Sequence, residues 1–381
     1  MTSGTPLRYL LLDGIARRLP APPPRPRATA IAVYSPGHLG DILHAVPMLK
    51  ALRKGKPEAK IVWLVGPWSE SLARRYAPCV DQIRAWGPNS PQYSRGKSEW
   101  RQNAWRQWRM AMDLRKEGVD VFIGPMDGAG RFLANAIVPR LWAGIGDRRP
   151  PRVRVEIETV VQPYEKDRYE ADALCGLLEP LGIEAKADRL EYAATPEESR
   201  AANAFLKDQG VDPLRPLALI APGSGWTGKN WLPERFGETA RWLANTHGFQ
   251  IAWVGGPGEE SLVPSLCSND FNWIGKTPLP LLAAAMERVG LFIGNDGGLL
   301  HLAAALNVPT VSIWGPTSPW KWGPKGAIHR QIRKADRCEG CIYWDYRETC
   351  RHDRSCMKAV AAEEVEAAIR DLVLRGRPAG G

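Results

Sequence analysis

The 381-residue sequence contains no apolar run of the ~18 residues that a membrane-spanning helix requires. It also shows no secretory leader. The apolar stretch at residues 9–12 stops at Asp13, and Arg17 and Arg18 follow where a cleavage site needs small residues. We therefore expect a cytoplasmic protein.

Cysteine is scarce, with seven residues in the whole chain. In a reducing compartment this argues against a disulfide framework. Cys338 and Cys341 have the C-x-x-C spacing of a metal knuckle, but Cys350 and Cys356 are separated by five residues, which departs from ordinary zinc spacing. Structural zinc and reduced thiols both remain open for these four residues, and we predict no metal or other cofactor for the activity.

The sequence also lacks internal repeats and long low-complexity segments. What is present is a globular composition, with 44% hydrophobic and 24% charged residues, and a length typical of two or three domains. The formal charge of +10 indicates anionic partners such as nucleic acid, a membrane surface or phosphorylated ligands, or serves solubility alone.

The first residues form a region of their own. Leu7, Leu11, Ile15 and Leu19 recur at four-residue steps and predict a short helix over 7–19, which the proline-rich segment 21–27 separates from the rest. One hypothesis is that this arginine-bearing helix lies in the headgroup region of an anionic membrane, held away from the enzyme body. The alternatives are a disordered tail or a helix packed on the body.

From residue 28 onward, short runs rich in Val and Ile alternate with helical stretches. We predict buried parallel strands at 30–34, 61–65, 119–123, 217–221, 250–254, 291–293 and 310–314, and helices near 41–54, 99–116, 166–180, 233–246, 279–288 and 299–306. This alternation predicts a doubly wound α/β fold.

The rhythm weakens around 185–215, where Thr195-Pro196 and Asp212-Pro213 are breaker signals. We expect an N-terminal extension with a proline-rich spacer (1–27), a Rossmann-like domain (28–195), a second Rossmann-like domain (196–358) facing the first across a cleft, and a C-terminal helix and tail (359–381).

Ligands of such sheets bind beyond the carboxyl ends of the strands. The first candidate loop is Ser35-Pro-Gly-His-Leu-Gly-Asp41, in which Gly37 and Gly40 permit close approach of a ligand to the backbone. Asp41 is either a helix cap or a general base. A helix N-terminus stabilises the ionised carboxylate and weakens it as a base, so desolvation by a bound acceptor would have to restore its basicity.

The second loop, Ala221-Pro-Gly-Ser-Gly-Trp-Thr-Gly-Lys-Asn230, nearly matches the phosphate-binding G-x-x-x-x-G-K-[ST]. It departs from that motif at Asn230, where a hydroxyl should hold magnesium, and at Pro233, where the helix should already run. What remains is a glycine-rich loop that suits a diphosphate, with Lys229 either contacting the phosphates or simply solvated.

The third loop is Gly294-Asn-Asp-Gly-Gly-Leu-Leu-His301, which follows a predicted strand and opens a helix. Its short residues suit an anion at the helix N-terminus. His301, taken alone, is better explained as a hydrogen-bonded core histidine than as a ligand-binding residue.

Together these loops resemble glycosyltransferase family nine, the bacterial lipopolysaccharide heptosyltransferases, from about Ile31 to Val360. The resemblance rests on the order and spacing of five pieces: the Gly-Asp loop with Pro47 and Leu52-Arg53, Pro-Gly-Ser…Lys-x-Trp-x-Pro, Val254-Gly-Gly-Pro, Asp296-Gly-Gly-x-x-His301 and Trp314-Gly-Pro-Thr317. It implies a GT-B fold with an acceptor-binding N-terminal domain, a donor-binding C-terminal domain, and inversion by direct displacement. The family's commonest donor is ADP-heptose.

The resemblance also implies residue roles. Asp41 falls on the catalytic aspartate, with Gly40 beside it on the acceptor side. The implied donor-binding residues are Ser224, Gly225, Lys229, Glu259, Asp296, Gly297, Gly298 and His301. Glu260, next to Glu259, leaves the ribose-contacting acid uncertain by one residue. Gly297 departs from the family, which usually has Thr or Ser there, and no Asp-x-Asp pair is present to clamp a divalent ion.

Two runs in the N-terminal half are basic, with seven basic against three acidic residues in 95–117 and six against one in 131–154. They form either a solvated face or a surface for an anionic, lipid-linked saccharide acceptor, for which Lys97, Arg101 and Arg109 are the candidates. The tryptophans at 100, 105 and 108 are predicted to be helix core rather than sugar platforms.

Three classes of function therefore remain. The leading one is a metal-independent inverting transfer of heptose from ADP-heptose to an anionic lipopolysaccharide-core acceptor, with another nucleotide-sugar as its variant. The second is a P-loop-like nucleotidase, and the third is a non-catalytic basic binding protein. Peripheral contact with the inner face of the inner membrane is a further hypothesis, and we expect no nucleic-acid binding.

Overall fold

The computed structural model describes residues 7–23, 29–86, 99–146, 151–263, 270–334, 350 and 352–375. The chain divides into two compact units, Met1–Asp188 and Arg189–Gly381. The junction lies within the region where the predicted strand–helix rhythm weakens.

The first unit is built on a six-stranded parallel sheet. Its strands are β1 (Ala30–Ser35), β2 (Lys60–Val65), β3 (Gln82–Ala85), β4 (Val121–Ile123), β5 (Leu141–Gly146) and β6 (Glu158–Pro163), in the order β3-β2-β1-β4-β5-β6. In the centre of the sheet Ala32 pairs with Val62 on one side and with Phe122 on the other.

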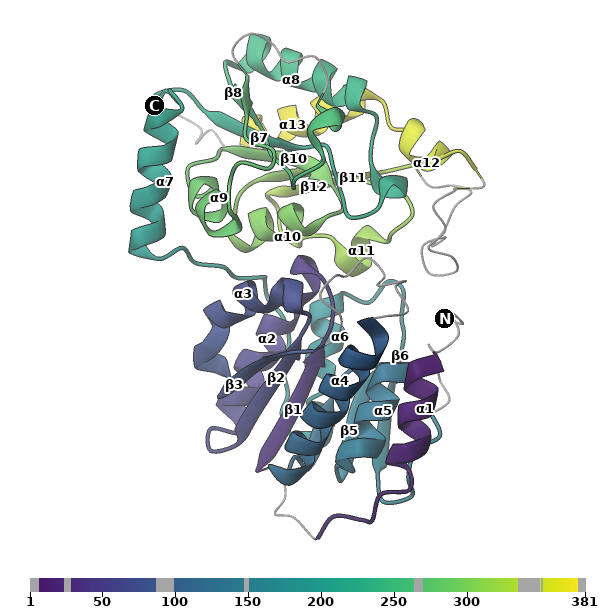
Figure 1. Ribbon diagram of the computed structural model, residues 1–381. Coiled ribbons are helices and arrows are strands. Elements are labelled where there is room, and N and C mark those ends of the chain that lie inside the picture. The colour runs from purple at the N-terminus through teal and green to yellow at the C-terminus, as the bar shows by residue number, and fades with distance from the viewer. Residues whose placement is uncertain are drawn as a thin grey trace. The chain divides into compact units, whose positions relative to one another are not determined.

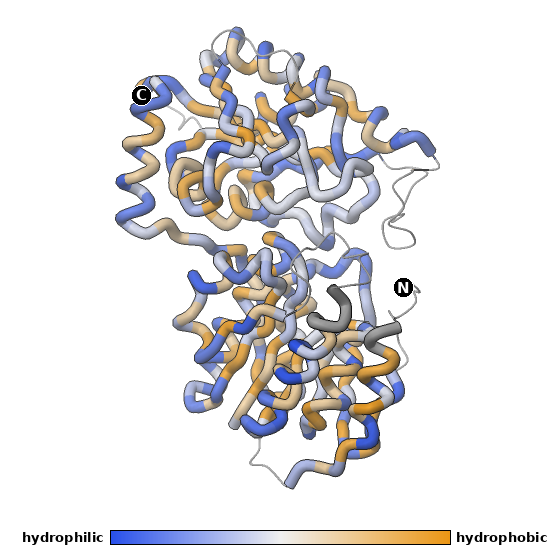
Figure 2. The backbone as a smooth tube through the Cα atoms, viewed as in Figure 1, coloured by the Kyte–Doolittle hydropathy of each residue, from blue (hydrophilic) through white to orange (hydrophobic). Residues whose placement is uncertain are grey.

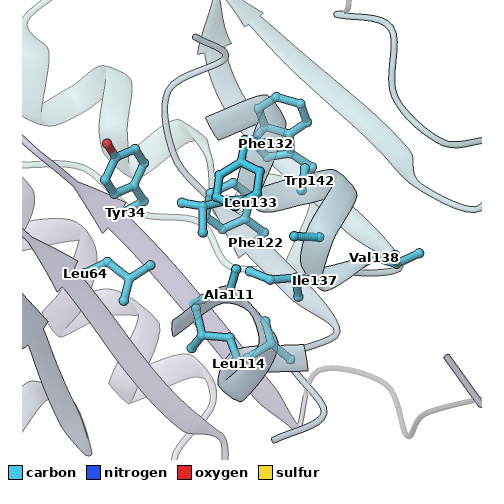
Figure 3. Packing of buried hydrophobic residues seen from close by; sticks show 14 of the residues in the cluster. Tyr34, Leu64, Ala111, Leu114, Phe122, Phe132, Leu133, Ile137, Val138 and Trp142 are labelled. Atoms are coloured by element: carbon cyan, nitrogen blue, oxygen red, sulfur yellow. The ribbon is translucent and has the colours of Figure 1, made fainter. Parts of the chain in front are cut away.

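Two helical layers cover this sheet (Figure 1). One contains α1 (Leu7–Ala16), α4 (Glu99–Lys116) and α5 (Gly128–Ile137), which contact one another. The other contains α2 (Leu39–Gly55), α3 (Glu70–Ala73) and α6 (Glu170–Gly176). Under the first layer, aromatic side chains of the sheet and of α5 pack closely, with Phe122 against Trp142 (Figure 3). Trp108 of α4 stacks on Phe132.

The second unit repeats this plan. Its strands are β7 (Leu217–Ala221), β8 (Gln250–Trp253), β9 (Phe271–Asn272), β10 (Leu291–Asn295), β11 (Thr310–Trp314) and β12 (His329–Arg333), in the order β12-β11-β10-β7-β8-β9. Its helices are α7 (Pro196–Asp208), α8 (Pro233–His247), α9 (Leu279–Met286), α10 (Gly298–Ala305), α11 (Pro319–Trp322), α12 (Ser355–Lys358) and α13 (Ala362–Arg375). Counted along its own chain segment, each sheet has the Rossmann order 3-2-1-4-5-6.

All seven predicted strands are present, and they form much of the hydrophobic interior of both units (Figure 2). The strands that the sequence did not reveal include the edge strands β3, β6, β9 and β12, whose residues are only partly buried or exposed. No helix within the described residues is long and apolar enough to cross a bilayer.

Two local predictions are wrong. Thr195-Pro196 does not break structure but starts α7, because the Thr195 side chain accepts a hydrogen bond from the Glu198 N–H and Pro196 occupies the first helical turn, where its missing N–H costs nothing. Trp105 is not core, since 60% of it is exposed on α4, whereas Trp108 packs on Phe132 as predicted. The side chain of Trp100 lies outside the described residues.

The first helix is packed on the body. Its buried Asp13 accepts a hydrogen bond from Asn135 of α5 at 2.5 Å and forms ion pairs with Arg17 at 3.2 Å and Arg131 at 3.3 Å. Of the alternatives for the N-terminal segment, the structure therefore selects the packed helix. Arg131, which belongs to the basic run 131–154, therefore helps to hold α1 on the body.

Candidate functional site

Each sheet has one topological switch point, where strand order reverses and the loops that leave two adjacent strands diverge to opposite faces. In the first unit it lies between β1 and β4, and in the second between β7 and β10. Open α/β sheets bind ligands in the crevice at this position. All three predicted loops leave one of these strands: 35–41 leaves β1, 222–230 leaves β7 and 296–301 leaves β10.

In the first unit, Asp41 stands at the start of α2 beyond the end of β1. Its Oδ2 accepts a hydrogen bond from the His38 N–H at 2.6 Å, so the carboxylate does cap the helix. The loop before it is fixed from the β2 side, because the Gly37 carbonyl accepts hydrogen bonds from Trp68 Nε1 at 3.0 Å and Ser69 Oγ at 2.9 Å. This half-buried carboxylate, on a loop fixed by these contacts, is a candidate general base as well as a cap.

The β4 side of this switch point carries a carboxylate that sequence reasoning missed. Asp127 follows β4, and its Oδ1 accepts a hydrogen bond from Gly130 N–H at 2.7 Å at the start of α5. The backbone passes so close here that a Cβ on Gly130 would lie 2.0 Å from the Pro125 carbonyl oxygen. The sequence does contain a signal for Asp127, since an aspartate that follows a strand often caps a helix. We missed it because the Gly-Ala-Gly that comes next does not suggest a helix.

In the second unit, a buried polar cluster joins the loops after β7, β10 and β11. The Asp296 Oδ2 accepts hydrogen bonds from Lys229 Nζ at 2.9 Å and from Thr317 Oγ1 at 2.7 Å. His301 Nε2 of α10 lies 3.5 Å from the other carboxylate oxygen. Three of the predicted residues thus meet at one point, and Thr317 joins them from the Trp-Gly-Pro-Thr loop.

The charge balance of this cluster favours the ionised carboxylate. Burial would raise the pKa of Asp296, but the Lys229 ammonium and the His301 side chain outweigh it and hold that pKa well below its usual range. Only 6% of the Asp296 side chain and 19% of the Lys229 side chain are exposed. The cluster is therefore an ion pair with a small opening to solvent on the lysine side.

A second set of contacts holds the glycine-rich loop itself in place. Asn295, buried at the end of β10, donates from Nδ2 to the Pro222 carbonyl at 2.8 Å and accepts at Oδ1 from the Trp231 N–H at 2.9 Å. Ser224 Oγ donates to Asn230 Oδ1 at 2.6 Å, inside the same loop. Asn295 was not predicted as a site residue, because nothing in the sequence tells a buried amide from any other asparagine near a strand end.

The two glycines after Asp296 lie beside this loop. Gly297, in extended backbone, precedes α10, and a Cβ placed on it would lie 3.8 Å from the Cβ of Ser224. Gly298 is the first residue of α10. Gly297 thus lacks the hydroxyl that the family pattern has at this position. The backbone itself has room for a serine.

The acid after β8 is brought to the same place. A Cβ on Gly223 would lie 2.2 Å from the Glu259 carboxyl carbon, so that carboxylate lies directly against the loop after β7. It accepts a hydrogen bond from Gly256 N–H at 2.9 Å, and burial raises its pKa. Glu260 is directed elsewhere, with its carboxylate near Gly275. Glu259 is therefore the one of the two acids that the fold places at the loop.

The other predicted acceptor residues are distributed differently. Gly40 is buried in the first turn of α2 beside Asp41. Arg109 lies on the exposed face of α4 with its guanidinium 5.6 Å from the centre of the Trp105 ring. Lys97 and the side chain of Arg101 lie outside the described residues, as do Cys338 and Cys341. Among the described residues, no cluster of three or more His, Cys, Asp or Glu side chains could hold a metal ion.

Comparisons with known proteins agree with this architecture. The model of the family described as glycosyltransferase family 9 (heptosyltransferase) matches residues 170–351. The lipopolysaccharide core heptosyltransferase OpsX of Haemophilus influenzae is 24% identical over 75% of this chain and 79% of its own length. Lipopolysaccharide heptosyltransferase 2 of Escherichia coli K12 is 28% identical over 81% and 92%.

Among solved structures, the E. coli ADP-heptose lps heptosyltransferase II superposes with a TM-score of 0.68 at 18% identity, over 91% of this chain and all of that one. Two Rossmann-type units, each with loops gathered at its switch point, give this chain the GT-B fold. With the sequence matches, the chain is a glycosyltransferase similar to the heptosyltransferases of glycosyltransferase family 9.

Proposed function

We propose that this enzyme is an inverting heptosyltransferase that transfers heptose from ADP-heptose to an anionic, lipid-linked lipopolysaccharide-core saccharide. The observation that carries the proposal is the cluster of Lys229, Asp296, His301 and Thr317 at the switch point of the second sheet, beside a glycine-rich loop. The relatives are lipopolysaccharide heptosyltransferases and the structural neighbour is an ADP-heptose enzyme, which supports the choice of sugar, nucleotide and acceptor class.

The second unit is proposed to bind the donor. The backbone amides of the loop 222–230 and the N-terminus of α10 would surround the diphosphate, with Ser224 and Gly225 on one side and Gly297 and Gly298 on the other. Glu259 would accept hydrogen bonds from the ribose hydroxyls. The Lys229 ammonium, oriented by Asp296, would stabilise the charge that develops on the leaving diphosphate.

The first unit is proposed to bind the acceptor and to activate it. Asp41 would take the proton of one acceptor hydroxyl as its oxygen forms a bond to the anomeric carbon of heptose. The bond from that carbon to the diphosphate oxygen breaks at the same time, ADP leaves with the electron pair, and the anomeric configuration inverts. The proposed mechanism requires no metal ion. Gly40 would admit the acceptor, and Lys97, Arg101 and Arg109 are proposed to attract its anionic groups.

The P-loop alternative is disfavoured by the backbone around Lys229. In a P-loop the lysine stands in the first turn of an α-helix. Here Thr227–Lys229 form a single 3-10 turn, Asn230 is extended, and α8 begins only at Pro233. A family member that uses a different nucleotide-sugar remains the alternative within the same class.

The decisive experiment is donor consumption with and without acceptor. The enzyme is incubated with ADP-heptose, with another nucleotide-sugar, and with ATP, each with and without a soluble delipidated core acceptor. We expect ADP release from ADP-heptose only when the acceptor is present. ATP hydrolysis independent of acceptor would support the nucleotidase, and consumption of another nucleotide-sugar alone would refute the heptose assignment.

A further inference from the structure

The exposed apolar side chains of this protein are unevenly distributed. Seven large hydrophobic residues are exposed within the described ranges: Leu10, Leu11, Ile15, Trp105, Val155, Leu214 and Trp320. The first five belong to the first unit. Their exposed fractions range from 47% for Leu10 to 100% for Val155, so each presents much of its side chain to solvent.

These five residues come from segments that lie side by side. Helix α1 carries three of them and contacts α4, which carries Trp105 (Figure 1). The segment 152–155, which carries Val155, is tied to the end of α1. Arg17 donates a hydrogen bond to the Arg152 carbonyl, and Arg154 donates one to the Leu19 carbonyl.

Helix α1 is oriented with its polar residue inward. The Asp13 side chain is only 8% exposed, and Asn135, Arg17 and Arg131 surround its carboxylate. Leu10, Leu11 and Ile15 face solvent on the same helix. Leu12 and Ala16 of the same helix do pack into the core. Folding therefore accounts for the inner apolar face of α1, but not for the second, outward apolar face.

The charges around these apolar residues are mostly of one sign. Exposed arginines interleave with them: Arg17, Arg18, Arg106, Arg109 and Arg152. Arg109 lies over the exposed Trp105 ring. Within the described side chains, exposed acids on these segments are Asp113 on α4 and Glu156, and Glu156 is bridged to Arg154 at 2.7 Å. We call the five apolar residues and these five arginines the α1–α4 surface.

We propose that the α1–α4 surface docks on an anionic phospholipid leaflet. Aliphatic and tryptophan side chains enter the boundary between headgroups and acyl chains, while arginines pair with lipid phosphates and extend their apolar stems along the membrane. A second copy of the chain fits less well, because a symmetric contact would bring arginines of the same surface against one another. The proposal shares Arg109 with the acceptor contacts proposed above, but it does not depend on which sugar or acceptor the enzyme uses.

The test is sedimentation of the full-length protein with vesicles, without donor or acceptor. Phosphatidylglycerol-containing vesicles are compared with pure phosphatidylcholine vesicles at low and high salt. Deleting the N-terminal segment is a poor test, because loss of Asp13 would also remove the partner of Arg131 and Asn135. Point variants on the outer face avoid this problem, and thermal melting verifies that each is folded.

The molecule supplies matched controls. Trp105 and Trp320 are both 60% exposed, and each has an arginine over its ring, Arg109 at 5.6 Å and Arg333 at 5.7 Å. Trp105→Ala is therefore paired with Trp320→Ala, and Leu11→Ser with Leu214→Ser. For charge, Arg106→Gln/Arg109→Gln is paired with Arg200→Gln/Lys207→Gln on α7 of the second unit.

We expect binding to phosphatidylglycerol vesicles that weakens with salt and is much weaker on phosphatidylcholine. Leu11→Ser should lower the partition coefficient about fivefold, and the Arg106/Arg109 double variant by tenfold or more, on the order expected for one half-buried leucine and for two arginines near a charged surface. The controls should bind as the unaltered protein does.

Three outcomes would overturn the proposal. These are no binding to anionic vesicles, equal losses in a test variant and its control, or a concentration-dependent dimer that Leu11→Ser abolishes. Heptosyl transfer is measured separately, as ADP release in the presence of a soluble acceptor. A vesicle-binding protein without that activity would leave the membrane proposal intact and refute only the proposed reaction.

Discussion

The ion pair between Lys229 and Asp296 provides the sharpest test of the donor site. Both partners are largely removed from water, and the carboxylate also accepts the Thr317 hydroxyl. Removing one member of a buried pair leaves the other charge uncompensated, which typically costs 3–5 kcal/mol. Because Lys229 retains partial exposure, we expect about 3 kcal/mol of unfolding free energy to be lost in Asp296→Asn, and a similar loss in Lys229→Met.

The double variant separates the pair from its surroundings. If the ion pair dominates, Lys229→Met/Asp296→Asn should be destabilised by about as much as either single variant, which gives a coupling free energy of about 3 kcal/mol. Urea unfolding measures all three variants against Lys207→Met, an exposed surface control. Additive losses would refute the structural coupling.

The pH dependence has a defined direction. The folded-state pKa of Asp296 is depressed, so the pair stabilises the protein fully above the usual carboxyl pKa of 3.8, and this stabilisation is lost as pH falls below that value. The stability difference between the unaltered protein and Asp296→Asn should therefore be constant from neutral pH down to about 5 and shrink below about 4. A difference unchanged at low pH would show that Asp296 acts by packing alone.

Nucleotide binding separates the two residues functionally. Lys229→Met should weaken ADP binding by about 1.5–3 kcal/mol, the range for a hydrogen bond to a charged group, with a comparable loss of turnover. Asp296→Asn should not weaken ADP binding, because it removes an anion that competes with the diphosphate for Lys229. Titration calorimetry decides this point, and unchanged affinity in Lys229→Met would place the diphosphate elsewhere.

Three further predictions concern other parts of the two switch points. Asp41→Asn should lower turnover about 100- to 10,000-fold with donor affinity little changed, because the amide still caps α2 but cannot take a proton; near-normal turnover would leave Asp41 as a cap only. Glu259→Gln should weaken ADP binding by about 1 kcal/mol while its neighbour variant Glu260→Gln has no effect, and the reverse pattern in calorimetry would exchange their roles. Asn295→Ala should lower the unfolding free energy by about 2–4 kcal/mol, because it leaves the Pro222 carbonyl and the Trp231 N–H without their partner in the interior. A urea midpoint equal to that of the unaltered protein would contradict this.

The sequence by itself determined seven of the eight interior strands, all except β5, and the loops that follow β1, β7 and β10. Runs such as 217–221 and 310–314 are buried on both faces of a parallel sheet, so each of their residues is apolar or small and the run is visible without a partner. Glycines and short polar residues after β1, β7 and β10 marked the binding loops for the same local reason. The family resemblance followed from their order.

Edge strands and several helices were decided by tertiary structure. The residues of β12 are His-Arg-Gln-Ile-Arg, which carry no strand pattern of their own and become a strand by pairing with β11. Helix α5 begins with Gly-Ala-Gly, which disfavours a helix locally, yet the close passage at Pro125 requires such small residues. The pairing with β11 in the first case and the close backbone contact in the second outweighed local propensity.

Only the fold could bring the site together. Lys229, Asp296 and Thr317 are 67 and 21 residues apart in sequence and meet because β7, β10 and β11 are adjacent in the sheet. The fold also decides that Glu259, and not Glu260, lies against the loop after β7. In the same way, packing against α5 decides that Asp13 of α1 points inward. Sequence patterns specify which residues can bury or bind, whereas the positions at which they meet follow from strand order and packing.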